Sequence, residues 1–489
     1  MKRVCMLLVF LLLLTGCGQG EGAPQPAPES ENAPINVDIY AVNDLHGKLA
    51  DTNSQPGVDE LSTYLENAGA AGHTLLLSTG DMWQGAAESN LTGGLIVTEW
   101  MNELGFAAMT LGGHEYDWGE DQIRQNDAAA DFPFLGINIY NRATNQRVDY
   151  CRSSVMVDVE GVQIGIIGAI GNCYYSIASE NTQDVYFKVG NELTALVKEE
   201  SKKLRDAGAD CIIYTIHDGY EKSLPAGSTV PDEELREYYD ASLSEGYVDI
   251  VFEADSHYTY AFTDRHGVYH LQAGGNNTGI SHATVQIDPS TDAVAVVMAE
   301  TVPSATYGTG EDAPVVEQLL DKYAGQISDA NRVLGTNKWY RGGDVLCGIV
   351  ANLYSTKGVE RWGAQYDIVL GGGYISCRSP GHLPIGEVRY SQLVSLLPFD
   401  NPITLCSIQG RDLIDRFLEN DHYAYYIHTT DYGNSILDNI DPDGVYYVVT
   451  DAYTANYTYN RMTVVDTYAE DVFARDLLAD YITEGGLDR

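Results

Sequence analysis

The chain has 489 residues, of which 44% are hydrophobic and 20% are charged, and this composition argues against a globally disordered chain. At about 150 residues per domain, the length is enough for two or three domains, and two is the simpler interpretation. The 28 Lys and Arg residues against 70 Asp and Glu residues leave a formal net charge of −42, which argues against DNA or RNA as a partner. A small anion can still be held by metal ions or arginines inside a pocket.

The N-terminus has the pattern of a secretory signal over residues 1–17. Lys2 and Arg3 precede the apolar run Val4–Leu14, which is shorter than the roughly 20 residues that span a bilayer and suits the apolar region of a signal peptide. The run ends in a Leu-Thr-Gly-Cys sequence that resembles a bacterial lipobox, so Cys17 is predicted to become a lipid-modified N-terminus. An ordinary signal peptide with a chance cysteine is the alternative.

Residues 18–34 are rich in Pro, Glu, Ala and Gly and are predicted to form a disordered tether. Together with Cys17, they predict an exported lipoprotein on the cell surface, anchored to the bacterial membrane through its lipid alone. Export permits disulfides, but the cysteines after Cys17 have no Cys-x-x-Cys spacing, so their pairing stays open.

Residues 35–310 alternate short apolar runs with helical patterns and glycine-containing turns, which is typical of an α/β domain. The stretch Asn191–Ala207 is predicted to be one of the helices. The predicted strands are Val37–Val42, Thr74–Ser78, Ala108–Leu111, Val162–Ala169, Cys211–Ile216 and Val248–Phe252.

A second α/β unit is predicted at residues 341–489, after a linking segment at residues 311–340. Within that segment, Val315–Ile327 has the apolar spacing of a helix. The second unit includes the strand Asp367–Leu370, followed by a predicted turn of three glycines at 371–373.

Five of the predicted strands in the first unit run directly into polar residues. Ligands of α/β sheets gather beyond the carboxyl ends of strands, and Asp and His side chains from several strands are what a divalent-cation site needs. A single Asp-x-His or Gly-Asp is common in turns, but the joint occurrence in this order indicates one metal constellation. The residues are Asp44, His46, Asp81, His114, Asp117, His217, Asp255 and His257.

The series Asp-x-His, Gly-Asp-x-x-x-Gly, Gly-x-His-Glu-x-Asp, a strand-terminal His and a closing Asp-x-His resembles the calcineurin-like metallophosphoesterases. With its C-terminal block, the chain resembles the bacterial 5′-nucleotidase and UDP-sugar hydrolase family from about Asn36 to Ile482. The resemblance implies an α/β fold: a metallophosphoesterase sandwich with helices outside, followed by an α/β nucleotidase C-terminal domain that binds substrate. It also implies two divalent metal ions, Mn, Zn or Mg, roughly 3.5–4 Å apart.

The resemblance assigns metal-ligand roles position by position. Asp44, His46 and His257 match ligands of the first metal. Asp81 matches the carboxylate that bridges both ions, and His217 matches a ligand of the second.

His114 and Asp117 match the catalytic pair of the family. The resemblance implies that water held by the metals attacks phosphorus, while His114, oriented by Asp117, stabilises charge on the phosphate and protonates the leaving oxygen. Two positions depart from the family pattern. Gly113 replaces an Asn ligand of the second metal, and Asp255 replaces a His ligand of the same metal. We therefore expect a weak second site that favours Mn²⁺ or Mg²⁺, since oxygen ligands suit these ions.

The C-terminal block has candidate substrate-binding residues. Arg378 is predicted to hold an anionic group in place of an Arg that the family has nearby, with an exposed loop arginine as the alternative. Phe399 and Asn401 belong to a Pro-Phe-x-Asn segment that resembles the family's own. Tyr453 and Tyr432 are predicted to be the two rings that sandwich a nucleobase.

These features predict a 5′-nucleotidase that releases phosphate from nucleotides outside the cytoplasm for salvage, with a small-molecule nucleotide or phosphate ester as partner and no nucleic acid polymer. One alternative is a degenerate nucleotide-binding lipoprotein without catalysis, because of Gly113 and Asp255. The other is a related hydrolase of nucleotide sugars, cyclic nucleotides or other phosphate esters, because the glycine turn and the tyrosine-rich C-terminus depart from the family.

Overall fold

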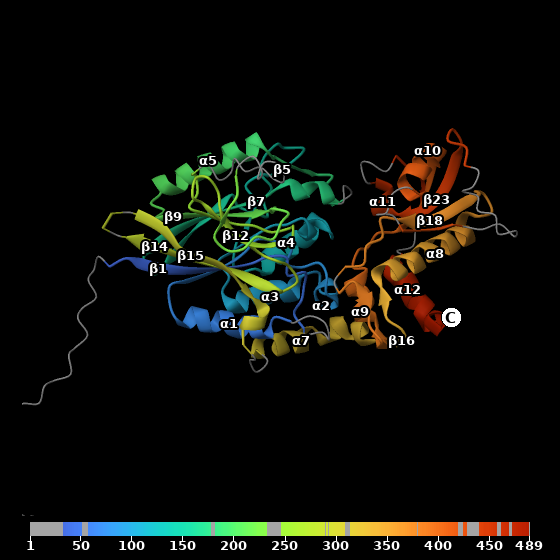
Figure 1. The fold of residues 1–489 in the computed structure, drawn as a ribbon, viewed down its shortest axis with the longest axis horizontal. Helices are drawn as coiled ribbons and strands as arrows, with labels where there is room; N and C mark the ends of the chain where they lie inside the picture. Colours follow the sequence, from blue (N-terminus) through green and yellow to red (C-terminus); the bar gives the residue numbers. More distant parts are fainter. Residues whose placement is uncertain are drawn as a thin grey trace, which may run out of the picture.

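The computed structural model describes residues 33–488, apart from positions 51–56, 178–180, 232–245, 289, 292, 309–312, 379, 419–423, 428–439, 457–460 and 469–471. These residues form two α/β units that lie side by side, the second at the right of Figure 1. Cys17 and Tyr432, and the predicted tether up to residue 32, fall outside the described residues.

The first unit contains two large β-sheets whose facing sides share one apolar core, and a small sheet of β5 (Ile139–Asn141) and β8 (Val185–Phe187). Ile39 and Leu77 from the first sheet and Ile166 and Ile213 from the second are fully buried in this core. The first sheet has the order β15 (Ala293–Pro303), β14 (Gly279–Asp288), β1 (Ile35–Val42), β2 (Thr74–Ser78), β3 (Ala108–Thr110) and β4 (Phe134–Leu135). The second has the order β10 (Ser228–Thr229), β12 (Thr259–Thr263), β13 (Tyr269–Ala273), β11 (Ile250–Phe252), β9 (Cys211–His217), β7 (Val162–Ile170) and β6 (Ser154–Val159).

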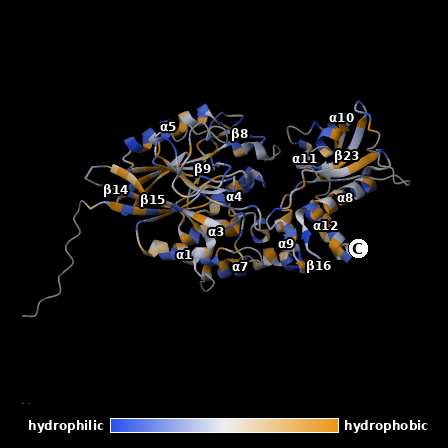
Figure 2. Ribbon diagram, in the orientation of Figure 1, coloured by the Kyte–Doolittle hydropathy of each residue, from blue (hydrophilic) through white to orange (hydrophobic). Residues whose placement is uncertain are grey.

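Helices cover the outer faces of both sheets, with α5 on one side and α1, α3 and α7 on the other (Figure 1). Their apolar residues complete the core: Trp100 of α3 and Leu319 of α7 contact the first sheet's outer face, and Val197 of α5 contacts the second sheet's. Figure 2 shows apolar residues concentrated in the strands, while α5 also carries polar residues. The helices of this unit are α1 (Asp59–Ala70), α2 (Ala87–Asn90), α3 (Leu95–Leu104), α4 (Glu120–Ala129), α5 (Asn191–Asp206) and α7 (Pro314–Ile327).

The direction of the strands places the site. Strands β1, β2 and β3 are parallel neighbours in one sheet, and β7, β9 and β11 are parallel neighbours in the other. The carboxyl ends of parallel neighbours meet at one edge of a sheet, so the loops after these strands converge. The polar residues that follow the predicted strands lie in these loops.

The second unit is built around a five-stranded sheet with the order β22 (Ala424–Ile427), β18 (Ile368–Gly373), β23 (Val445–Asp451), β21 (Ile403–Gln409) and β24 (Thr463–Thr467). The long helix α8 (Gly343–Trp362) lies against this sheet (Figure 1), and its residues Leu346, Val350 and Tyr354 are buried. The remaining elements are β16 (Val333–Asn337), β17 (Arg341–Gly342), β19 (His382–Leu383), β20 (Gly386–Arg389), α9 (Tyr390–Leu396), α10 (Gly410–Leu413), α11 (Ala452–Asn456) and α12 (Ala474–Thr483). The predicted two-unit α/β class is thus confirmed, while the exact domain boundaries stay a prediction.

The predicted glycine turn at 371–373 is wrong, because these residues lie within β18 and pair with β22 on one side. The glycines are explained by close packing instead. A Cβ on Gly371 would overlap the backbone of Ala351 and Ser355 in α8, and one on Gly373 would meet the side chains of Thr450 and Thr454. Glycine at these positions lets the helix approach the strand closely. A run of glycines in a sequence looks the same whether it forms a turn or allows such a contact.

Candidate active site

The converging loops hold their polar residues in an unusual backbone conformation. Five of the predicted metal ligands have left-handed φ angles, which non-glycine residues rarely adopt: Asp44 (48°), His46 (50°), Asp81 (55°), Asp255 (66°) and His257 (58°). Such strain costs on the order of 1–3 kcal/mol per residue and clusters at functional sites, where the surrounding structure enforces it. The concentration of strained residues in these loops marks them as a candidate site.

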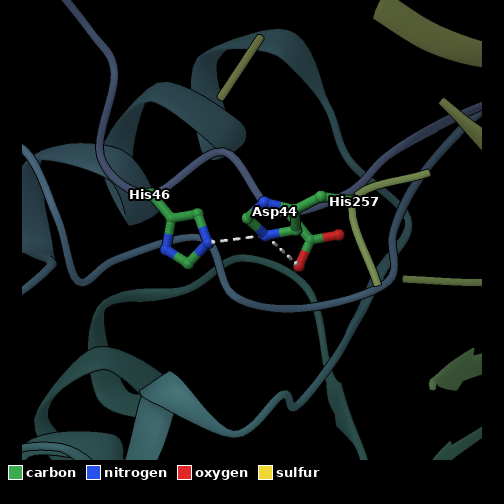
Figure 3. Close-up of side chains that lie close together, drawn as sticks. All are labelled: Asp44, His46 and His257. Atoms are coloured by element: carbon green, nitrogen blue, oxygen red, sulfur yellow. Dashed lines mark hydrogen bonds and ion pairs between the residues drawn. The ribbon is translucent and has the colours of Figure 1, made fainter. Parts of the chain in front are cut away.

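Asp44, His46 and His257 form the first group of potential metal ligands (Figure 3). Their donor atoms lie within 4.8 Å of one another. His46 Nε2 is 3.1 Å from His257 Nε2, which in turn is 3.4 Å from Asp44 Oδ1. The structure therefore brings together the three residues predicted for the first metal.

A second group is made of Asp44, Asp81 and His217, again with donor atoms within 4.8 Å of one another. His217 Nε2 lies 3.2 Å from Asp81 Oδ1 and 4.0 Å from Asp44 Oδ1. Burial opposes the charge on Asp81, but the imidazoles of His217 and His114 hold the pKa of Asp81 well below its ordinary value. Asp44 is the residue that the first two groups share, so the bridging role of Asp81 stays a prediction.

The histidines His46 and His217 are held in the tautomer that a metal ion needs. Nδ1 of His46 is 2.9 Å from the carbonyl oxygen of Gln84, and Nδ1 of His217 is 2.7 Å from that of Thr79. A carbonyl oxygen only accepts, so both Nδ1 atoms carry a proton and both Nε2 atoms are the ones turned toward a cation. Ligating histidines usually have this arrangement, because the outer hydrogen bond fixes ring and tautomer. Divalent cations therefore fit the residues present.

His114 and Asp117 lie side by side, as predicted for the catalytic pair. His114 Nδ1 is 2.8 Å from Asp117 Oδ2, and the backbone N–H of His114 donates to Asp81 Oδ1 at 2.8 Å. Burial alone would lower the pKa of His114, but the carboxylates of Asp117 and Asp81 outweigh it and raise that pKa to about 9. The two carboxylates thus favour the protonated ring, and Asp117 fixes its orientation.

Glu115 supports this arrangement, a role that the motif alone did not assign to it. Its carboxylate is fully buried and accepts hydrogen bonds from the backbone N–H groups of Asp81, Met82 and Gly112, at 2.9, 2.8 and 2.7 Å. It thereby joins the loop after β2 to the loop after β3. The sequence contained one indication of this role: Glu115 is a charged residue that lies between His114 and Asp117 in the motif.

A cavity of about 700 Å³ lies over these residues and is lined by both units. The predicted substrate residues Arg378, Phe399, Asn401 and Tyr453 all line it, as do His114 and Asp117 of the first unit. Tyr374, whose side chain is 49% exposed, also lines the cavity and had no predicted role in binding. Its place could not be expected from the sequence, since tyrosines are too frequent in this chain for one to stand out.

Arg378 reaches the catalytic pair from the second unit. Its Nη2 is 3.0 Å from His114 Nε2, and its guanidinium carbon is 5.5 Å from the centre of the Phe399 ring. The backbone N–H of Arg378 donates to the carbonyl oxygen of Leu396 at 2.9 Å. The preceding residue, Cys377, has its thiol 3.8 Å from that of Cys347, and both thiols are free. Arg378 is thus a cavity residue rather than an exposed loop arginine.

The loop that carries Phe399 is held by an arginine from the last helix, α12. Arg475 forms an ion pair with Asp400 and donates to the carbonyl oxygen of Pro398 at 3.3 Å. The Phe399 ring lies 5.7 Å from the ring of His114. The Pro-Phe-x-Asn segment is therefore fixed against the catalytic pair of the other unit.

The two departures from the family pattern have structural consequences. Gly113 has ordinary right-handed helical angles, φ −68° and ψ −44°, so the backbone there does not require glycine. A Cβ at this position would meet only Ile177 Cγ1, at 3.7 Å. Asp255 lies over the site with a side chain that is 39% exposed, and burial of its carboxyl raises its pKa to about 6. Asp255 Oδ1 is 4.0 Å from His217 Nε2.

The chain is 31% identical over 224 residues to the UshA protein of Yersinia enterocolitica, which is 44% of this chain and 39% of the relative. It is 31% identical over 205 residues to a 5′-nucleotidase of Vibrio vulnificus, which is 40% of this chain and 34% of the relative. The chain thus matches less than half the length of these curated relatives. A scan against models of protein families finds no match.

Among solved structures, the 5′-nucleotidase precursor of Thermus thermophilus superposes with a TM-score of 0.72 and 17% identity, over 92% of this chain and 96% of that one. The chain therefore has the same class of fold as that structure, with two α/β units of which the first is a sandwich of two sheets. Within that class, the sequence and structural similarities confirm the resemblance to the 5′-nucleotidase family.

Proposed function

We propose that the chain is a metal-dependent phosphoester hydrolase that acts on nucleotides, with a nucleoside 5′-monophosphate as its substrate class. The observation that supports this most is that the grouped carboxylates and imidazoles, the His114–Asp117 pair and Arg378 open into one cavity, which Tyr374 and Tyr453 also line. When bound, divalent cations act as Lewis acids on a phosphoryl group. If the phosphate of a nucleotide lay at the metal ligands, its nucleoside would extend toward the side chains of the second unit that line the cavity.

Different side chains of the site are placed for proton transfer and for binding the charge of the phosphate. When its Nε2 is protonated, His114 is placed to donate that proton to the leaving oxygen, with Asp117 accepting from Nδ1. Arg378, which lies against His114 Nε2, is placed to hold a phosphate oxygen with parallel N–H donors. Glu115 keeps the two catalytic loops in register through its three backbone hydrogen bonds.

A phosphate-release assay over a substrate panel tests this proposal. The panel contains nucleoside monophosphates, a nucleotide sugar, a cyclic nucleotide and nitrophenyl phosphate, each with Mn²⁺, Zn²⁺ or Mg²⁺ added. Release from nucleoside monophosphates above all others supports a 5′-nucleotidase, and a preference for another ester supports a related hydrolase. Nucleotide binding without release from any of them would instead support the silent binding protein that Gly113 and Asp255 suggest.

We expect Tyr453→Ala to weaken nucleotide binding by about 1–3 kcal/mol, the scale of base–aromatic stacking. Hydrolysis of nitrophenyl phosphate should hardly change, because that ester has no nucleobase. The KM for both substrates checks this, with Tyr340→Ala as a matched control, since Tyr340 is 66% exposed and does not line the cavity. Equal losses on both substrates would show that Tyr453 supports the fold instead.

We further propose that the protein is exported and held to the membrane by lipid on Cys17. Among the described residues, every helix is too short or too polar to cross a bilayer. Cells grown with a fatty-acid analogue should label the wild-type protein, and Cys17→Ser should lose the label while Cys151→Ser keeps it. Label that persists in Cys17→Ser would contradict the lipid anchor.

A further inference from the structure

A third group of potential metal ligands contains a cysteine that no sequence motif indicated. The donor atoms of Cys173, His217 and Asp255 lie within 4.8 Å of one another. Cys173 and Asp255 follow β7 and β11, and His217 is the last residue of β9, which lies between those two strands at the edge where the other ligands gather. A tetrahedral ion with bonds of about 2.0–2.3 Å holds its ligand atoms roughly 3.5 Å apart, so the three donors need only small shifts to share an ion.

His217 indicates that something binds in this group. Its ring is fully buried, and Nε2 lies 3.2 Å from Asp81 Oδ1 and 4.0 Å from Asp255 Oδ1. Nδ1 carries a proton because it faces the carbonyl oxygen of Thr79, so Nε2 is the nitrogen that a cation can reach. Carboxylates that converge on a buried ring nitrogen need a positive charge between them. A cation between His217, Asp255 and Cys173 would supply that charge.

Cys173 also lies near position 113, where glycine provides no side-chain ligand for the second metal. Cys173 lies on the short helical turn Asn172–Ser176, and the next residue along, Ile177, is the one that a side chain at position 113 would meet. The segment that contains Cys173 thus borders the space in which a ligand from position 113 would lie. A thiolate from this segment can supply the ligand that glycine cannot.

We propose that Cys173, His217 and Asp255 bind the second divalent cation, with the Cys173 thiolate as the ligand that compensates for Gly113. The proposal rests on the function proposed above, since it completes the metal centre of the same site. A thiolate is a soft ligand, so this site selects Zn²⁺, Co²⁺ or Cd²⁺ over Mg²⁺ and Mn²⁺. This differs from the oxygen-rich, weak second site that the sequence predicted.

Binding requires no redox step. The Cys173 thiol donates to the carbonyl oxygen of His217 at 3.0 Å, so its proton points to the backbone of another ligand. As the cation binds, the sulfur keeps its electron pair and the proton leaves to solvent, as occurs when thiols ligate metals. At least the thiol proton is therefore released for each ion that this group takes up.

Titration of the metal-free full chain with Co²⁺ or Cd²⁺ tests the proposal. A sulfur-to-metal charge-transfer band in the near ultraviolet should grow with the second equivalent. Cys173→Ser should lose the band and bind the second ion at least roughly tenfold more weakly, the lower end of what lost ligand support costs. Serine can keep the hydrogen bond to the His217 carbonyl, so a circular dichroism spectrum should stay unchanged.

The controls separate Cys173 from the other thiols. Cys151→Ser is matched, because the Cys151 thiol is equally buried and also donates to a backbone carbonyl, that of Gly136 at 3.5 Å, but belongs to no ligand group among the described residues. It should keep the band. The titration is repeated in a Cys347→Ser, Cys377→Ser background, since these adjacent thiols could themselves bind a soft cation.

The outcomes distinguish this inference from the proposed function. Two bound ions without a charge-transfer band, or a band that Cys173→Ser keeps in the double-serine background, would overturn the role of Cys173 and leave the hydrolase intact. Failure to bind any ion would overturn both. A band that depends on Cys173, in a protein that releases phosphate from no ester, would support the metal site and overturn the hydrolase.

Discussion

Replacing Asp81 or His114 with Ala is expected to lower phosphate release by roughly 10²–10⁴-fold, the scale of a lost general acid or charge-stabilising group. Asp81 Oδ1 contacts both His217 Nε2 and the backbone N–H of His114, so its loss disturbs the metal ligands and the catalytic pair together. Loss of His114 removes the proton donor and leaves the metal groups in place. Initial rates at saturating metal measure both effects.

The matched control for this prediction is His73→Ala, because His73 lies on the surface beside Glu160 and away from the site. It should retain the wild-type rate. Asp81→Asn is added because it keeps the shape of the side chain and removes its charge. Wild-type rates in both Asp81→Ala and His114→Ala would refute the assignment of a metallophosphoesterase.

The second large effect is expected at Arg378, whose replacement by Ala should lower kcat/KM by roughly 10²–10³-fold, as loss of one donor to a developing oxyanion does. The guanidinium lies 3.0 Å from His114 Nε2 and lines the cavity beside Phe399. Arg378→Lys should restore only part of the activity, because an ammonium cannot donate two parallel hydrogen bonds. Separate kcat and KM values for nucleotide and nitrophenyl phosphate measure the loss.

Arg411→Ala is the control for Arg378, since Arg411 pairs with exposed Asp443 and does not line the cavity. Because both substrates carry a phosphate, Arg378→Ala should impair both, in contrast to Tyr453→Ala. If Arg378→Ala left kcat/KM unchanged, Arg378 would contact His114 only in the substrate-free protein and would not hold the phosphate.

The contact between Arg378 and His114 brings both units to the candidate active site. Asn90, in α2 of the first unit, donates to the carbonyl oxygen of Pro398 at 3.4 Å, and Arg475 holds the same loop from α12. These contacts place Phe399 and Arg378 over the catalytic pair. In the proposed hydrolase, the second unit would therefore contribute to the reacting centre itself as well as to nucleotide binding.

The sequence by itself determined the α/β class, several of the strands and the candidate ligand residues near their ends. Apolar runs such as Thr74–Ser78 coincide with a strand because a buried parallel strand must be apolar along its whole length. Asp44 and Asp81 could be predicted because each directly follows such a run, and the carboxyl ends of parallel strands share an edge. Local order along the chain was sufficient for these residues.

Only the tertiary structure decided which other residues join the site. Cys173 has no motif around it and becomes a candidate ligand because β7 lies next to β9, which brings it to His217. Arg378 meets His114 from a separate unit, and no spacing along the chain encodes that contact. The glycines at 371–373 were misassigned for the same physical reason: whether a glycine forms a turn or admits a neighbouring helix depends on what packs against it.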